Sequence, residues 1–244
     1  MDVTARRLPY ARGLVMRTAL WLQAVGLVVC IAAVWLDMLG YGSGVAAILL
    51  YLVVAACVIT RISGSHPHEA FGAANAVTLV RAGMIALVAA TAFETLDDGA
   101  ALAIAAFCGL ALALDGIDGW LARRSGLAST FGARFDLEVD ALFVLILSVC
   151  AYMHGKAGIW VLLIGLMRYG LLSAGFLSKR LEAPLPESLR RKAICVVQIA
   201  ALALLLLPQI VPPVSAWIAA VALALLTWSF AVDIRYLLRR DRSA

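Results

Sequence analysis

Long apolar runs alternate with short polar segments along the whole chain. Eight of these runs are each about 20 residues long, the length that a helix needs to cross a hydrocarbon layer about 30 Å thick. Backbone polar groups find no partners in lipid, so such runs form helices. The pattern predicts an all-α, polytopic membrane bundle with spans at residues 16–36, 44–60, 76–96, 100–121, 134–154, 157–178, 191–207 and 214–236.

The composition supports a membrane protein. Of the 244 residues, 64% are hydrophobic and 14% are charged, whereas soluble domains have about 25% charged residues. Basic residues before the first span also fit a cleaved signal peptide. That span is too long for a signal sequence, however, and no small-residue cleavage site follows it. We therefore expect it to remain as a helix.

Basic residues indicate the topology, because Lys and Arg beside short loops collect on the cytoplasmic side. With both termini in the cytoplasm, Lys156 is the only basic loop residue that falls on the outer side. The net charge of +5 is thus a topology signal, and we expect no nucleic-acid partner. The expected location is a bacterial inner membrane with the active site at its cytoplasmic face. The cytoplasmic ends carry Arg61, Arg123, Arg124, Arg134, Lys179, Arg180, Arg190, Arg191, Lys192, Arg235, Arg239, Arg240 and Arg242.

A polar stretch divides the chain into unequal parts. We expect a two-helix membrane hairpin at residues 1–61 and an interfacial connector helix at 62–75. A six-helix catalytic core follows at 76–237, and a basic cytoplasmic tail at 238–244. The hairpin carries no charge in its apolar interior, so we interpret it as an anchor or packing partner.

Charge inside the predicted membrane region is concentrated in the segment ALDGIDGWLARRSGLASTFGARFDLEVDAL, residues 113–142. Asp115 and Asp118 are three residues apart, and Asp136 and Asp140 are four apart, so each pair shares one face of its helix. The short loop between these helices makes them antiparallel neighbours. The spacing predicts that four carboxylates converge near the inner end of the bundle.

Clustered carboxylates in a low-dielectric pocket need cations, because like charges at close range disfavour ionisation. An all-oxygen ligand set favours hard divalent ions, Mg²⁺, Mn²⁺ or Ca²⁺, over zinc. Two such ions about 3.5 to 4 Å apart are typical of phosphoryl transfer, and Arg123, Arg124 and Arg134 suit a phosphate-bearing ligand. The depth of the cluster matches a lipid headgroup, which indicates a nucleotide-linked lipid as substrate.

The segment also contains a spaced motif. It follows the pattern D-x2-D-G-x2-A-R-x8-G-x3-D-x3-D and thereby resembles the signature of the CDP-alcohol phosphotransferase (phosphatidyltransferase) family. The glycines and alanine of this pattern also fit close helix packing in a membrane. The matching residues are Asp115, Asp118, Gly119, Ala122, Arg123, Gly132, Asp136 and Asp140.

This resemblance implies a six-helix membrane enzyme, usually dimeric, that moves a phosphoalcohol unit from a CDP-alcohol to an acceptor hydroxyl and releases CMP. It implies two divalent ions, Mg²⁺ or Mn²⁺, on the first three aspartates, with Asp140 completing the metal site and acting as the catalytic base. Direct in-line attack is our preferred route, and Asp140 as a nucleophile is the alternative. The implied CDP-binding residues are Gly119, Ala122, Arg123 and Gly132, joined by Asn75, Thr78 and Arg81 in an N-x2-T-x2-R pattern.

Four basic residues of the sixth and seventh spans are candidates for acceptor binding: Arg168, Arg190, Arg191 and Lys192. A lone Arg in a membrane helix faces a cavity or a partner, although the last three also fit positive-inside anchors. The arrangement is similar to phosphatidylglycerophosphate synthases, without the glycine and threonine of their basic pattern. CDP-diacylglycerol is the preferred donor, because the short polar loops leave no separate soluble domain, and a soluble CDP-alcohol is the alternative that the motif does not distinguish. Glycerol 3-phosphate is the first candidate acceptor, and inositol phosphate, inositol, serine or another phosphatidyl acceptor are the alternatives.

Two other classes of function fit a membrane bundle with clustered carboxylates. A divalent cation transporter would use the carboxylates as its ion site, but such sites lie near the midplane between repeats, and this chain has neither feature. A non-catalytic scaffold would not need so much charge inside a membrane.

Overall fold

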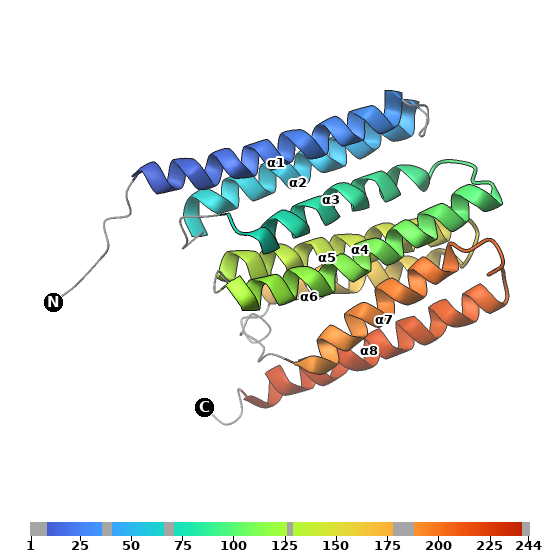
Figure 1. Cartoon of the computed structure of the whole chain (residues 1–244). Helices are drawn as coiled ribbons and strands as arrows, with labels where there is room; N and C mark the ends of the chain where they lie inside the picture. The colour runs from blue at the N-terminus through green and yellow to red at the C-terminus, as the bar shows by residue number, and fades with distance from the viewer. Residues whose placement is uncertain (1–8, 36–40, 66–70, 126–128, 178–187, 241–244) are drawn as a thin grey trace. The chain divides into compact units, whose positions relative to one another are not determined.

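The computed structural model describes residues 9–35, 41–65, 71–125, 129–177 and 188–240. In these residues all regular structure is helical, which confirms the predicted all-α class (Figure 1). This described part of the chain forms eight α-helices and one 3-10 helix, η1. They are α1 (Pro9–Trp35), α2 (Tyr41–Ser65), α3 (Ala73–Thr91), α4 (Asp98–Ser125), α5 (Thr130–Met153), η1 (Ile159–Val161), α6 (Leu162–Leu177), α7 (Leu189–Leu205) and α8 (Val214–Arg240).

Five of the described helices are long and apolar enough to cross a membrane: α1, α2, α3, α4 and α8. Of the eight predicted spans, all eight are thus confirmed as helices in the described residues, and five as candidate membrane spans by length and composition. Helices α6 and α7 have only 16 and 17 residues. Helix α5 has 24, but every window of spanning length within it contains at least three charged residues. Helix α5 therefore misses the composition of a membrane span because of its charged residues, which include the candidate site residues Asp136 and Asp140.

The third helix was predicted too long, because α3 ends at Thr91 and not at residue 96. After Thr91 the chain turns through short-range bonds, including Phe93 N–H to the Ala90 carbonyl at 3.4 Å. At its other end, α3 follows Gly72, whose φ of 84° suits glycine. Residues 66–70, in the middle of the expected connector helix at 62–75, lie outside the described residues. That helix and the division into hairpin and core stay predictions.

The chain forms two compact units. The first comprises residues 1–94 and 113–139, and the second comprises residues 95–112 and 140–244. In the first unit α1 and α2 pack against each other and against α3. Tyr51 of α2 joins them: its ring lies against Gly26 of α1, and a Cβ on Gly83 of α3 would be 3.5 Å from it. Helix α3 is the most buried of the five candidate spans, so its polar side chains face protein.

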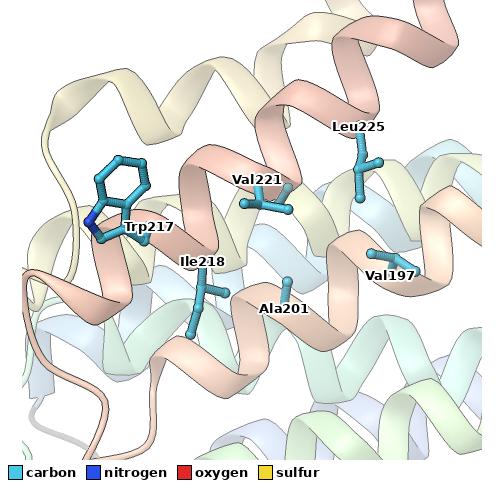
Figure 2. A pocket seen from close by; sticks show the side chains of 7 residues that line it. Val197, Ala201, Trp217, Ile218, Val221 and Leu225 are labelled. Atoms are coloured by element: carbon cyan, nitrogen blue, oxygen red, sulfur yellow. The ribbon is translucent and has the colours of Figure 1, made fainter.

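In the second unit, α7 and α8 pack side by side with α6 and η1 nearby. Gln198 of α7 donates to the Ala222 carbonyl of α8 at 2.8 Å. A groove of about 310 Å³ also runs between these helices, and all its lining side chains are apolar. Figure 2 shows Val197 and Ala201 of α7 and Ile218 of α8 along it. The groove offers no group for acid, base or metal chemistry.

Lys156, the predicted exception to the positive-inside pattern, stabilises a turn. Its Nζ donates to the carbonyls of Leu207 and Ile210, at 2.9 Å each, where α7 has ended. Burial lowers the pKa of Lys156, and the nearby Asp98 carboxylate opposes that shift. The ammonium therefore ties the segment after α7 together, where the Leu207 carbonyl also accepts from the Ile210 N–H at 3.1 Å.

We expect Lys156→Met to destabilise this turn, because two carbonyls lose a charged donor. The loss should be about 1 to 3 kcal/mol, seen as a melting temperature lower by roughly 2 to 8 °C in detergent. Arg235→Met, which removes an exposed cation of α8, is the matched control and should leave the melting temperature unchanged. Equal melting temperatures for both variants would show that the Lys156 bonds contribute nothing to stability.

Candidate active site

A fully buried arginine lies at the centre of the candidate site. Arg81 of α3 has no exposed surface, and its Nη1 lies 2.9 Å from Asp115 Oδ1, 3.1 Å from Asp118 Oδ2 and 2.8 Å from Asp136 Oδ1. The aspartates come from α4 and α5. The convergence predicted from helical spacing is thus confirmed for the carboxylates of these three aspartates.

Thr78 lies one turn before Arg81 and also contacts the cluster. Its hydroxyl lies 3.1 Å from Asp118 Oδ2 and 3.1 Å from the Ala74 carbonyl, so the two oxygens are alternative acceptors for its proton. Asn75, one turn earlier, donates its amide to the Phe71 carbonyl. The N-x2-T-x2-R spacing therefore puts three polar side chains on one face of α3, and two of them contact carboxylates.

The three aspartates fit a hard divalent cation. One carboxylate oxygen from each can be chosen so that all lie within 4.8 Å of one another, and oxygen donors are what Mg²⁺ and Mn²⁺ prefer. Asp118 is buried, with 4% of its side chain exposed, whereas the side chains of Asp115 and Asp136 are 21% and 38% exposed. A ligand can therefore reach the cluster from the side of Asp115 and Asp136.

Asp140 follows Asp136 by one turn of α5 and belongs to the second unit. There its Oδ2 is 3.8 Å from the Sγ of Cys195, a weak thiol donor on α7. The residue is partly buried. Its predicted roles as fourth metal ligand and as base stay predictions.

Gly132 brings α5 close to α3. A Cβ at this position would lie 2.7 Å from Asn75 Oδ1 and 3.3 Å from Ser129 Oγ. The Gly132 N–H donates to Ser129 Oγ at 3.0 Å, which caps the start of α5. Close helix packing therefore accounts for this glycine, and its place beside Asn75 leaves the predicted nucleotide role open.

We expect Gly132→Ala to push the Asn75 side chain away and to weaken donor binding by about tenfold, a loss near 1.4 kcal/mol. The dissociation constant of CDP, measured by calorimetry in detergent, is the readout. Gly109→Ala is the control, since nothing lies within 4 Å of a Cβ at that α4 position. A lower melting temperature with unchanged CDP affinity would mean that Gly132 serves packing alone.

The other predicted nucleotide residues are in α4. Gly119 directly follows Asp118 and is partly buried. Ala122 and Arg123 belong to the same helix, but their side chains lie outside the described residues. Arg124 lies over the Trp120 ring, 5.0 Å from its centroid, a cation–π contact.

The basic start of α7 pairs with an aspartate that sequence reasoning missed. Asp233 of α8 is 5% exposed and forms ion pairs with Arg190 Nη2 and, at 3.2 Å, with Arg191 Nη1. Arg190 also donates to the Ser229 carbonyl at 2.9 Å. In the sequence, Asp233 is a lone acidic residue in the last apolar run, and this could have indicated a basic partner. These contacts hold α7 to α8.

The remaining acceptor candidates lie in the second unit. Arg168 of α6 is partly buried, and Lys192 of α7 is exposed. Their predicted roles stay predictions.

A family model described as CDP-alcohol phosphatidyltransferase matches residues 71–228. The match includes every aspartate of the cluster and begins two residues before α3. No curated protein sequence and no solved structure gives a significant match.

Proposed function

Since the chain belongs to the CDP-alcohol phosphatidyltransferase family, we propose that it moves a phosphatidyl group from CDP-diacylglycerol to glycerol 3-phosphate and releases CMP. Family membership carries the reaction class, a membrane transferase of phospholipid biosynthesis. The observation that supports the site is the convergence of Asp115, Asp118 and Asp136 within 4.8 Å. The acceptor rests on the basic residues alone.

Asp115, Asp118 and Asp136 would hold two divalent ions, Mg²⁺ or Mn²⁺. When bound, these ions supply neutralisation of the donor diphosphate and a better CMP leaving group. The Thr78 hydroxyl, 3.1 Å from Asp118 Oδ2, would orient that carboxylate when it donates to it. Preorganised carboxylates of this kind reduce the reorganisation that the reaction needs.

The donor would lie with its cytidine against the small surface of Gly119, Ala122 and Gly132. Arg123 would face its diphosphate, and its acyl chains would remain in the bilayer. The acceptor oxygen attacks the phosphorus that carries diacylglycerol, and the bond from that phosphorus to the bridging oxygen breaks. CMP leaves, and the acceptor proton passes to Asp140 as general base.

Arg168, with Arg190, Arg191 and Lys192, would bind a phosphate on the acceptor. We expect Arg168→Ala to raise the KM for glycerol 3-phosphate by roughly tenfold or more, because a charge-assisted bond to phosphate is lost. The KM for CDP-diacylglycerol should change less than twofold. Steady-state CMP release measured against each substrate separates these effects. A larger change in the KM for CDP-diacylglycerol would show that Arg168 binds the donor and not the acceptor.

The deciding experiment gives the purified protein CDP-diacylglycerol, Mg²⁺ or Mn²⁺, and one acceptor at a time. CMP release with glycerol 3-phosphate supports the proposal, whereas release only with inositol phosphate, inositol or serine names another acceptor. Metal uptake into liposomes without CMP release under any condition would favour a cation transporter. The proposal includes a homodimer in a bacterial inner membrane, with the site at the cytoplasmic face.

A further inference from the structure

A single guanidinium nitrogen contacts three carboxylates. Arginine usually pairs with one carboxylate through two parallel bonds from its fork, whereas Arg81 Nη1 lies 2.8 to 3.1 Å from oxygens of Asp115, Asp118 and Asp136. The same three residues form the group whose oxygens suit a metal ion. The positive charge of Arg81 therefore lies where the carboxylates converge.

Burial makes these ion pairs important for stability, because neither Arg81 nor the carboxylates can be left unpaired at low cost. The Arg81 side chain is 0% exposed, and an unpaired charge in such a place is strongly unfavourable. The carboxylates in turn repel one another without a cation between them. Three carboxylates and one guanidinium leave a formal charge of −2, so the group is partly compensated and still attracts a divalent ion.

We propose that Arg81 is an internal counter-cation that keeps the three aspartates together before metal binds and then competes with the metal for the same carboxylates. A carboxylate oxygen that bonds to the guanidinium has less electron density and less room for a metal ion. Loading the site therefore requires Arg81 to give up part of its contacts. This inference rests on the proposed metal-dependent transfer.

A role in donor binding alone makes a different prediction. If Arg81 only bound the diphosphate, its removal would weaken CDP binding and leave the affinity for a metal ion without nucleotide unchanged. Competition instead predicts that the protein binds the metal ion more tightly when Arg81 is replaced, because removing a positive charge next to three carboxylates strengthens their attraction for a cation.

The test measures Mn²⁺ binding to the full chain in detergent, without nucleotide, by electron paramagnetic resonance of the free ion. Arg81→Met should bind Mn²⁺ at least tenfold more tightly than the wild type. Its melting temperature in chelator should be lower than that of the wild type, and saturating Mn²⁺ should recover the difference. Arg81→Gln keeps an amide donor without the charge and replaces Arg81→Met if the latter does not fold.

Arg235→Met is the matched control, because it makes the same chemical change at an exposed position of α8. Its Mn²⁺ affinity should stay within threefold of the wild type. Unchanged or weaker Mn²⁺ binding in Arg81→Gln, or a melting temperature that Mn²⁺ does not recover, overturns the role of Arg81 and leaves the metal site in place. If wild type and variants alike bind no Mn²⁺, the metal-dependent function itself is wrong.

Discussion

Asp136→Asn is expected to reduce CMP release by about 10²- to 10³-fold, the size of effect seen when one group that stabilises transition-state charge is removed. Asp136 belongs to the three-aspartate group, and it accepts from Arg81 Nη1 at 2.8 Å. Asparagine has the same shape and keeps one acceptor oxygen, but it lacks the charge that holds a divalent cation. The rate of CMP release at saturating donor and acceptor is the measurement.

Glu138→Gln is the matched control for Asp136→Asn. It makes the same chemical change two residues further along α5, at an exposed position, and should retain near wild-type activity. Both variants should elute as the wild type does in size-exclusion chromatography. An Asp136→Asn protein with at least half the wild-type rate would remove this residue from the site.

Asp140→Asn is expected to bind the donor normally and to lose about 10²- to 10⁴-fold in turnover, the usual contribution of a general base. If Asp140 takes the acceptor proton, the CDP dissociation constant should stay within a factor of about two of the wild type. The two quantities are measured on one preparation, by calorimetry and by CMP release. Weaker CDP binding would assign Asp140 to the metal group, and unchanged turnover would exclude it as base.

Acceptor-free CMP release by the wild-type protein distinguishes in-line attack from a covalent route. In-line attack predicts that wild-type protein releases no CMP from CDP-diacylglycerol until an acceptor is added. A nucleophilic Asp140 would instead release up to one CMP per active site without acceptor, because the phosphatidyl group would remain on its carboxylate. Rapid-quench measurement of acceptor-free CMP release separates the two routes.

The sequence predicts best what depends on local periodicity. Asp115 and Asp118 share a face because three residues make nearly one helical turn, and the brief connection to α5 brings Asp136 to the same end. Likewise, eight apolar runs indicate eight helices. The boundary error at residues 92–96 arose because AFETL continues the apolar pattern of α3 while its backbone already turns.

Contacts between distant segments were harder to predict. Nothing local in NAVTLVR indicates that the Arg81 guanidinium meets three carboxylates 34 to 55 residues later in the chain. The pairing of Asp233 with Arg190 and Arg191 was missed because helical periodicity does not fix how one helix is rotated against the next. Such contacts depend on packing, as Gly132 beside Asn75 illustrates.

The most direct test of the central claim is the dependence of CMP release on divalent ions. Purified protein in detergent with CDP-diacylglycerol and the acceptor identified from the panel should release CMP with Mg²⁺ or Mn²⁺. It should stop when the ions are chelated, and resume when they are restored. Asp136→Asn should remain inactive under all three conditions. CMP release that continues undiminished in chelator would contradict the claim that these aspartates hold the ions on which the transfer depends.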